Sequence, residues 1–218
     1  MYSMTLYQDD LPAGKKAKAE NGQNSFCYVA EGSAVINGNS INADEAVFCE
    51  GTIEMEAAAT GASVWRIVLE PTDFEGKNLA VGDDITSFVK ISRAPQMFKL
   101  EAGQQWLFQL DGLFDNIGST GLHSHHGSGI RCLTDGNIHI RSNIGESFDL
   151  DGKGACWYEE GSYPVCATID DDTSAAFIRA MLLPVEYEKL RYNVNWMEDQ
   201  DPPEAKWKFY ARSVITLQ

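Results

Sequence analysis

All four histidines of this chain lie within one stretch of twenty residues, Gly121 to Ile140 (GLHSHHGSGIRCLTDGNIHI). They are His123, His125, His126 and His139. Imidazoles bind transition metals and exchange protons near neutral pH, so the cluster suggests a metal site or an acid–base site. His123 and His125 would share one face of a strand, because side chains two residues apart in a strand point the same way. Together they supply half of a site.

Short apolar runs separated by turn signals dominate the rest of the chain. The segment FCYVAEGSAVING (26–38) reads as two strands around a Glu-Gly turn, and RCLTDGNIHI (131–140) repeats this design around Asp135-Gly136. An Asp-Gly pair between apolar runs is a strong hairpin signal. Convincing amphipathic helices are scarce, and PVEYEKLRYNV (184–194) is one weak candidate. The pattern predicts an all-β protein with little helix.

A two-residue turn at Asp135-Gly136 would fix which side chains of this hairpin share a face. If alternation runs unbroken from His123, four residues face inward: Arg131, Leu133, Ile138 and Ile140. His139 and Cys132 then face outward, so His139 is not expected to be a ligand.

An inward guanidinium must be paired, because an isolated buried charge is very costly. Glu159 and Glu160 are its candidate partners within the chain. The other candidate is an anionic substrate, since arginine binds carboxylates bidentately. We therefore expect Arg131 to be substrate-binding, together with Tyr163 at the mouth of the site. No catalytic residue can be assigned.

The two halves of the chain contain similar segments in the same order. Each match aligns apolar residues around a shared glycine or proline. The three matches are Cys27–Ile36 with Arg131–Ile140, Ala46–Ala57 with Cys156–Ala167, and Val64–Pro71 with Phe177–Pro184. Three ordered matches rarely arise by chance, so the sequence predicts a tandem duplication of a β unit of about seventy residues.

Composition excludes several classes of partner. The formal net charge is −15, and the only basic cluster is Lys15, Lys16 and Lys18, so neither nucleic acid nor an anionic membrane is expected as a partner. No apolar run approaches membrane-spanning length, and the first twenty residues lack the apolar core of a secretory signal. The five cysteines form no CxxC and are expected to be reduced thiols of a cytoplasmic protein.

This pattern resembles the cupin superfamily, and within it a bicupin. The first cupin motif, G-x5-H-x-H-x3,4-E-x6-G, is matched by Gly121, by His123 and His125, and by Gly136. The second motif, G-x5-P-x-G-x2-H-x3-N, is matched by Gly154 and Gly161. The resemblance covers both halves of the chain. It implies an all-β fold of two tandem cupin barrels, each a double-stranded β-helix or jelly roll.

Two usual cupin ligands are replaced in the second half. Gly129 holds the glutamate position of the first motif, which we expect to open space in front of Arg131, and Pro164 holds the histidine position of the second. The corresponding positions of the first half are Ala19, Asn21, Ser25 and Glu54. That half has no histidine, so the resemblance implies that it is a degenerate, structural cupin. We expect all ionisable pocket chemistry to lie in the second half of the chain.

The resemblance also implies a domain organisation. We expect a degenerate cupin over residues 1–72, a cupin carrying the histidine cluster over 85–184, and a tail over 185–218 that packs back on the barrels. Because cupin sheets often pair across dimers, a homodimer is expected.

Within the second barrel, His123 and His125 would hold one divalent transition metal, either Fe, Mn, Ni or Zn. The candidates for the third ligand are Glu159, Glu160 and His126, and we expect Glu159. The sequence then favours a small-molecule-processing cupin, a metal-dependent lyase, isomerase or dioxygenase acting on a small acidic substrate. The alternative is a non-catalytic ligand-binding or regulatory cupin without metal.

Overall fold

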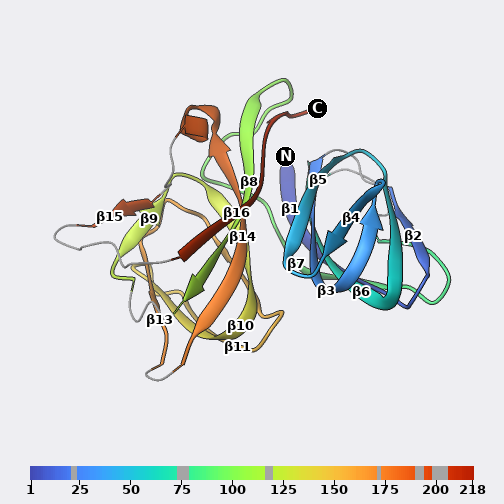
Figure 1. The fold of residues 1–218 in the computed structure, drawn as a ribbon. Helices are drawn as coiled ribbons and strands as arrows, with labels where there is room; N and C mark the ends of the chain where they lie inside the picture. The colour runs from blue at the N-terminus through green and yellow to red at the C-terminus, as the bar shows by residue number, and fades with distance from the viewer. Residues whose placement is uncertain (21–23, 73–78, 116–119, 171–172, 190–193, 198–205) are drawn as a thin grey trace. The chain divides into compact units, whose positions relative to one another are not determined.

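The computed structural model describes the chain except for residues 21–23, 73–78, 116–119, 171–172, 190–193 and 198–205. It divides into two compact units, one formed by Met1–Ala94 with Gln218 and one formed by Pro95–Leu217. Each unit contains one curled antiparallel sheet (Figure 1). The helical element among the described residues is a short 3₁₀ helix, η1 (Val185–Lys189), at the place of the weak helix candidate. The prediction of an all-β fold with little helix is confirmed.

The first unit is a seven-stranded sheet with the path β4-β3-β6-β1-β7, in which β2 pairs with β6 and β5 pairs with β3. Its strands are β1 (Tyr2–Leu11), β2 (Lys16–Ala19), β3 (Asn24–Ile36), β4 (Asn39–Asn42), β5 (Glu45–Glu50), β6 (Ile53–Pro71) and β7 (Thr86–Arg93). Its apolar interior includes Leu11, Cys27, Val29 and Val64.

The second unit is a nine-stranded sheet with the path β15-β9-β13-β10-β14-β8-β16, in which β11 and β12 pair with β10. Its strands are β8 (Gln105–Asp115), β9 (His123–His125), β10 (Ser128–Ser142), β11 (Ser147–Asp151), β12 (Cys156–Glu159), β13 (Val165–Thr168), β14 (Ala175–Pro184), β15 (Val194–Trp196) and β16 (Lys206–Thr216). The C-terminal residues therefore supply two strands of this sheet, β15 and β16.

The hairpin predicted at Asp135-Gly136 is wrong. β10 runs straight through this pair, and its register against β14 shifts between Leu133 and Asp135. Gly136 has φ +75°, and a Cβ added there would lie 1.8 Å from the carbonyl oxygen of Ser174. A G1-type β-bulge and a type I′ hairpin turn both need a residue with positive φ, so the same Asp-Gly pair signals either one. The Glu-Gly turn expected in the first half is likewise a bulge within β3.

The predicted facing is confirmed despite this error. A bulge inserts one extra residue, which reverses the alternation in the same way as a two-residue turn would. Leu133, Ile138 and Ile140 accordingly belong to one buried cluster with Trp157. Arg131 stands opposite Trp157 in the β10–β12 register, so it shares the face of this cluster. Cys132 lies on the other face of the strand, as predicted, but it is 0% exposed and therefore does not reach solvent.

The expectation of five reduced cysteines is wrong for one pair. Cys132 on β10 and Cys156 on β12 lie directly opposite each other, with 4.1 Å between their Cα atoms, and form a disulfide. Cys27, Cys49 and Cys166 remain thiols.

Candidate functional site in the second unit

The histidine pair lies on β9, the short strand between β13 and β15. His123 and His125 are 7% and 5% exposed, and their rings meet edge to face at 5.0 Å. The ring of Trp196, on β15, lies 5.0 Å from that of His123. His123 Nδ1 lies 3.0 Å from the carbonyl oxygen of Gly121. Because a carbonyl oxygen only accepts, Nδ1 carries the proton and Nε2 keeps its lone pair.

Glu159 joins the histidines to Arg131. The register of β10 against β12 pairs Arg131 with Trp157 and Gly129 with Glu159. The indole Nε1 of Trp157 donates a hydrogen bond to Glu159 Oε1 at 2.7 Å. Glu159 Oε2 lies 2.8 Å from Arg131 NH2 and 3.2 Å from His125 Nε2. We call His123, His125, Arg131, Trp157 and Glu159 the Glu159 cluster.

Burial and charge fix the protonation states of this cluster. Burial lowers the pKa of His125 to about 3 and also lowers the pKa of His123. Burial acts to raise the pKa of Glu159, but the charge of Arg131 and the hydrogen bonds from His125 and Trp157 together outweigh it and hold the pKa below its usual value. Burial lowers the pKa of Arg131, yet arginine stays protonated in proteins. At neutral pH the cluster contains two neutral imidazoles, one carboxylate and one guanidinium.

A second buried ion pair, not predicted from the sequence, lies beside the cluster. Arg179 stands opposite Arg131 in the β10–β14 register. Its Nε donates to Asp111 Oδ1 at 2.7 Å and its NH2 to Asp111 Oδ2 at 3.1 Å. The repeat alignment contained the signal, since it places Arg179 in the same column as Arg66.

The first unit contains a corresponding buried ion pair. Arg66 Nε donates to Asp9 Oδ2 at 2.8 Å, and both side chains are 0% exposed. Arg66 stands opposite Cys27 in the β3–β6 register, as Arg179 stands opposite Arg131.

The first unit lacks the rest of the cluster. Ala17 pairs with Met55, as His123 pairs with Val165, so Ala17 and Ala19 hold the positions of the histidine pair. The sequence motif had placed Ala19 and Asn21 there, an offset of two residues, and Asn21 lies outside the described residues. Cys27 and Cys49 hold the positions of Arg131 and Glu159.

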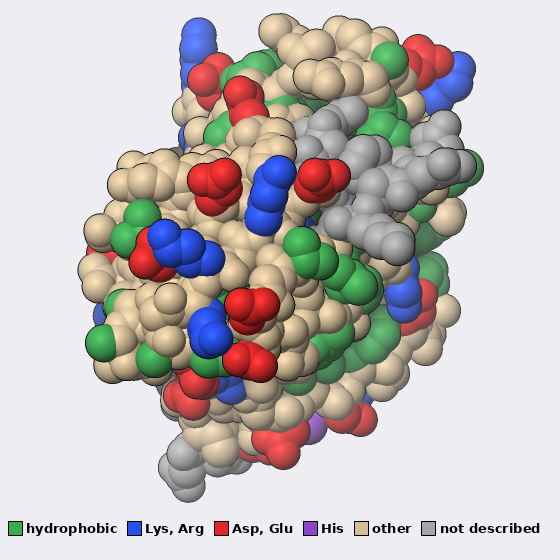
Figure 2. Space-filling view, turned by 90° about the vertical axis from the view of Figure 1, so that its right-hand side faces the viewer, with side chains coloured by type: hydrophobic (Ala, Val, Ile, Leu, Met, Phe, Trp, Pro, Cys, Tyr) green, Lys and Arg blue, Asp and Glu red, His purple; other side chains and the backbone are tan. Residues whose placement is uncertain are grey.

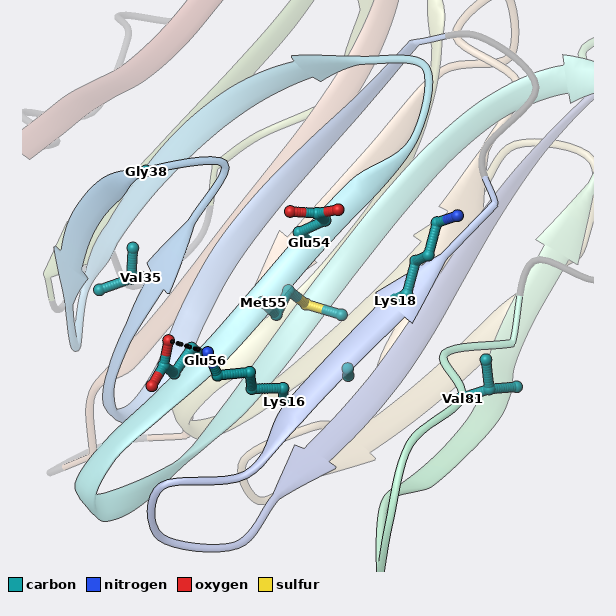
Figure 3. Close-up of a pocket in the computed structure, with 9 residues that line it drawn as sticks. Lys16, Lys18, Val35, Gly38, Glu54, Met55, Glu56 and Val81 are labelled. Atoms are coloured by element: carbon teal, nitrogen blue, oxygen red, sulfur yellow. Dashed lines mark ion pairs between the residues drawn. The ribbon is translucent and has the colours of Figure 1, made fainter.

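Glu54, which the motif comparison placed at a ligand position of the degenerate first half, points away from the interior. It lines an outer groove of about 390 Å³ on the first unit, across which Lys18 faces it (Figure 3). Within the same groove Lys16 forms an ion pair with Glu56 at 3.2 Å. The basic cluster noted in the sequence is therefore accompanied by acidic side chains. Figure 2 shows basic and acidic side chains interspersed on the face in view, without a basic patch.

The two alternative ligands of the second unit, His126 and Glu160, make other contacts. His126 stacks on Tyr187, with 4.3 Å between ring centroids. Glu160 accepts hydrogen bonds from the backbone N–H groups of Gln96 and Met97 and from the Tyr158 hydroxyl. Neither side chain is positioned to serve as the third ligand.

His139 and Tyr163 lie nearer to solvent than the cluster. His139 is on the outer face, as predicted, where its two ring nitrogens contact Asp149 and Asp170 at 2.8 and 3.1 Å. Tyr163, expected to bind substrate, is 47% exposed in the loop between β12 and β13.

Gly129 does not open space in front of Arg131, contrary to expectation. A Cβ at this position would lie 2.4 Å from the carbonyl oxygen of Ala180, so glycine is needed because β14 passes close by. The carbonyl oxygen of Gly129 instead accepts a hydrogen bond of 2.7 Å from Arg131 NH1.

Comparison with known proteins shows the class of fold. The chain matches no protein-family model and no curated protein. Among solved structures it is similar to the Lactobacillus farciminis oxalate decarboxylase in its formate complex, with a TM-score of 0.60 and 13% identity over 88% of this chain and 79% of that one. It is also similar to a Bacillus subtilis oxalate decarboxylase studied for its Mn(II) centres, with a TM-score of 0.59 and 11% identity over 88% and 71% of the two chains.

These likenesses, at low identity, show the fold and nothing finer: the chain is an all-β protein with the cupin jelly-roll fold. In the part of the chain that the structure describes, no helix is long and apolar enough to cross a membrane.

The metal that a cupin resemblance implies does not fit the Glu159 cluster as it is arranged. Among the described residues, no group of three or more His, Cys, Asp or Glu side chains is placed to hold a metal ion. His123 keeps a free lone pair on Nε2, which suits a ligand. The expected third ligand, Glu159, is already in contact with Arg131, Trp157 and His125. A metal ion would have to displace the guanidinium from that carboxylate.

Proposed function

We propose that the second unit binds a small carboxylate at Arg131, beside the histidine pair. One observation carries the proposal: Arg131 is 1% exposed, yet its NH2 group makes no directed hydrogen bond within the described residues. Glu159 Oε2, 2.8 Å away, attracts NH2 as an ion but does not lie along an N–H bond. A ligand carboxylate would satisfy this donor with a charge-assisted hydrogen bond.

The histidines favour binding over acid–base catalysis. A general acid or base works best with a pKa near the operating pH. Burial lowers the pKa of His125 to about 3, so its protonated form is scarce at neutral pH. The neutral rings can still orient a ligand through hydrogen bonds. The proposed function is therefore that of a small-molecule-binding cupin, with Tyr163 retained as a candidate contact at the mouth.

A thermal-shift screen of small organic acids tests this proposal. Charge-assisted hydrogen bonds contribute about 1.5–3 kcal/mol each, so loss of the fork-shaped guanidinium should weaken a ligand on the order of a hundredfold. The acids that stabilise the wild type should leave Arg131→Lys unshifted, because lysine lacks the fork. Arg141→Lys is the matched control, since Arg141 lies on the same strand with a half-exposed side chain. Equal stabilisation of all three proteins would refute the site.

A metal-dependent lyase, isomerase or dioxygenase is the second candidate. The observation that favours it is the orientation of His123, whose Nδ1 is fixed on the Gly121 carbonyl so that Nε2 is available. The Bacillus subtilis neighbour contains Mn(II) centres. Iron, manganese, nickel and zinc are the expected ions. This candidate requires stoichiometric metal in protein purified without chelator and its loss in the His123→Ala, His125→Ala double variant.

We further propose that the chain is a bicupin produced by duplication. The matched registers around Arg66 and Arg179 support this origin, although Asp111 stands directly opposite Arg179 whereas Asp9 lies two residues from the position opposite Arg66. A homodimer also remains a prediction, which light scattering would test. The cytoplasmic location was predicted from reduced cysteines, and the Cys132–Cys156 disulfide removes that argument; cell fractionation would test the location.

A further inference from the structure

We propose that the guanidinium of Arg131 is the built-in cation of the Glu159 cluster and takes the place of a divalent metal. The proposal goes beyond carboxylate binding, because it concerns how the chain neutralises its own carboxylate. It predicts that the wild type excludes divalent ions and that removal of one side chain creates a metal site.

The first argument is position. Glu159 Oε2 is the oxygen that a metal held with His125 would use, since it lies 3.2 Å from His125 Nε2. Arg131 NH2 lies 2.8 Å from the same oxygen. All three side chains are at least nine-tenths buried and come from three different strands. The guanidinium therefore lies against the same oxygen of Glu159 that a metal ion held with His125 would bind.

The second argument is charge. Among the described residues, the buried arginines and carboxylates that face the cluster are the cations Arg131 and Arg179 and the anions Glu159 and Asp111, whose formal charges cancel. A divalent ion beside Glu159 would place two further positive charges next to a buried guanidinium, where like charges repel most strongly. The interior is already balanced without a metal.

The third argument is that the guanidinium is held in place. Arg131 NH1 donates to the carbonyl oxygen of Gly129 at 2.7 Å. Gly129 holds the position at which the cupin motif has a glutamate ligand, and the nearby Ala180 carbonyl leaves no room for a Cβ there. Gly129 therefore lacks the usual glutamate ligand and also anchors, through its carbonyl oxygen, the guanidinium that replaces the metal.

Removal of the guanidinium should uncover a metal site. In Arg131→Met, Glu159 keeps its hydrogen bond from Trp157 but loses its cation. Two imidazoles and one carboxylate then remain, which are donor types of divalent transition-metal sites. No three such side chains among the described residues are already placed to share one ion, so the two rings and the carboxylate have to shift toward the space that the guanidinium leaves. Methionine fills much of the volume of the arginine stem without its charge.

The experiment is a Co²⁺ titration of untagged, chelator-treated protein, followed by calorimetry and by the visible absorption of the bound ion. We expect no stoichiometric binding by the wild type. Arg131→Met should bind close to one ion per chain, at least about tenfold more tightly than the wild type, and Arg131→Met with His125→Ala should lose it. Arg141→Met is the matched control, because it removes the same charge from the same strand and should gain nothing.

Two results would overturn the proposal. One is a wild type that binds one ion per chain as tightly as Arg131→Met. The other is a folded Arg131→Met that binds none. Should the methionine variant fail to fold, Arg131→Gln removes the same charge with a polar side chain, and the titration of the wild type alone still contradicts the proposal if it shows a stoichiometric site. Neither result depends on the organic-acid screen, so this proposal and the proposed function can fail independently of each other.

Discussion

The Asp111–Arg179 pair offers a sharp test of how the second unit is stabilised. Asp111 is 0% exposed, and Arg179 donates two hydrogen bonds to it. Asp111→Asn keeps the shape of the side chain but leaves the guanidinium without a counter-charge. Breaking a buried pair in this way costs about 3–5 kcal/mol, which is a large share of the roughly 5–15 kcal/mol of a whole domain. We therefore expect Asp111→Asn to be partly unfolded at moderate temperature.

Urea unfolding followed by tryptophan fluorescence measures this effect in the right unit, because four of the five tryptophans lie in the second unit. The double variant Asp111→Leu, Arg179→Met should recover most of the loss, since replacing a buried ion pair by apolar side chains is often neutral. Arg141→Met, which removes an exposed ion pair with Asp149 in the same unit, should change the free energy of unfolding by at most about 1 kcal/mol. Two results would refute the reasoning. One is a loss of less than about 1 kcal/mol for Asp111→Asn; the other is a double variant destabilised by as much as the sum of Asp111→Leu and Arg179→Met measured separately.

Three further outcomes follow from single features. His139 has its pKa raised by its hydrogen bond to Asp149, so its small stabilisation is complete below about pH 6.5 and is lost as pH rises through the raised pKa; His139→Gln should flatten this pH dependence of Tm. Gly136→Ala should cost more than the about 1–3 kcal/mol of a left-handed φ, while Gly145→Ala, whose Cβ would meet nothing within 4 Å, should cost only that strain in chemical denaturation. Alkylation of the denatured protein should label three thiols before reduction of the Cys132–Cys156 disulfide and five after it, as counted by mass.

The sequence predicted the architecture well because the signals for it are local. Alternating apolar residues and positive-φ glycines mark strands and their interruptions wherever they occur. They do not say whether the chain reverses, which is why the interruption at Gly136 was read as a hairpin when β10 continues through it. The inward facing of Arg131 survived the error, since a bulge and a two-residue turn change the alternation alike.

The site was predicted less completely because its partners are distant in sequence. Glu159 was proposed both as a metal ligand and as a partner of Arg131, and only the sheet register brings both contacts onto one oxygen. The pair of Arg179 with Asp111 joins residues 68 positions apart, and nothing local marks Asp111 as buried. The disulfide likewise depends on which strand lies beside β10.

The two units also serve as a comparison within one chain, if they arose by duplication as proposed. Both keep an arginine at the matched position, Arg66 or Arg179, bound to an aspartate of the neighbouring strand. A feature kept in both copies is best explained by folding. The histidine pair and the Arg131–Glu159 contact occur in the second copy alone, where the first has alanines and the thiols of Cys27 and Cys49. Because a stable barrel can be built without them, their presence in the second copy argues for selection on a ligand.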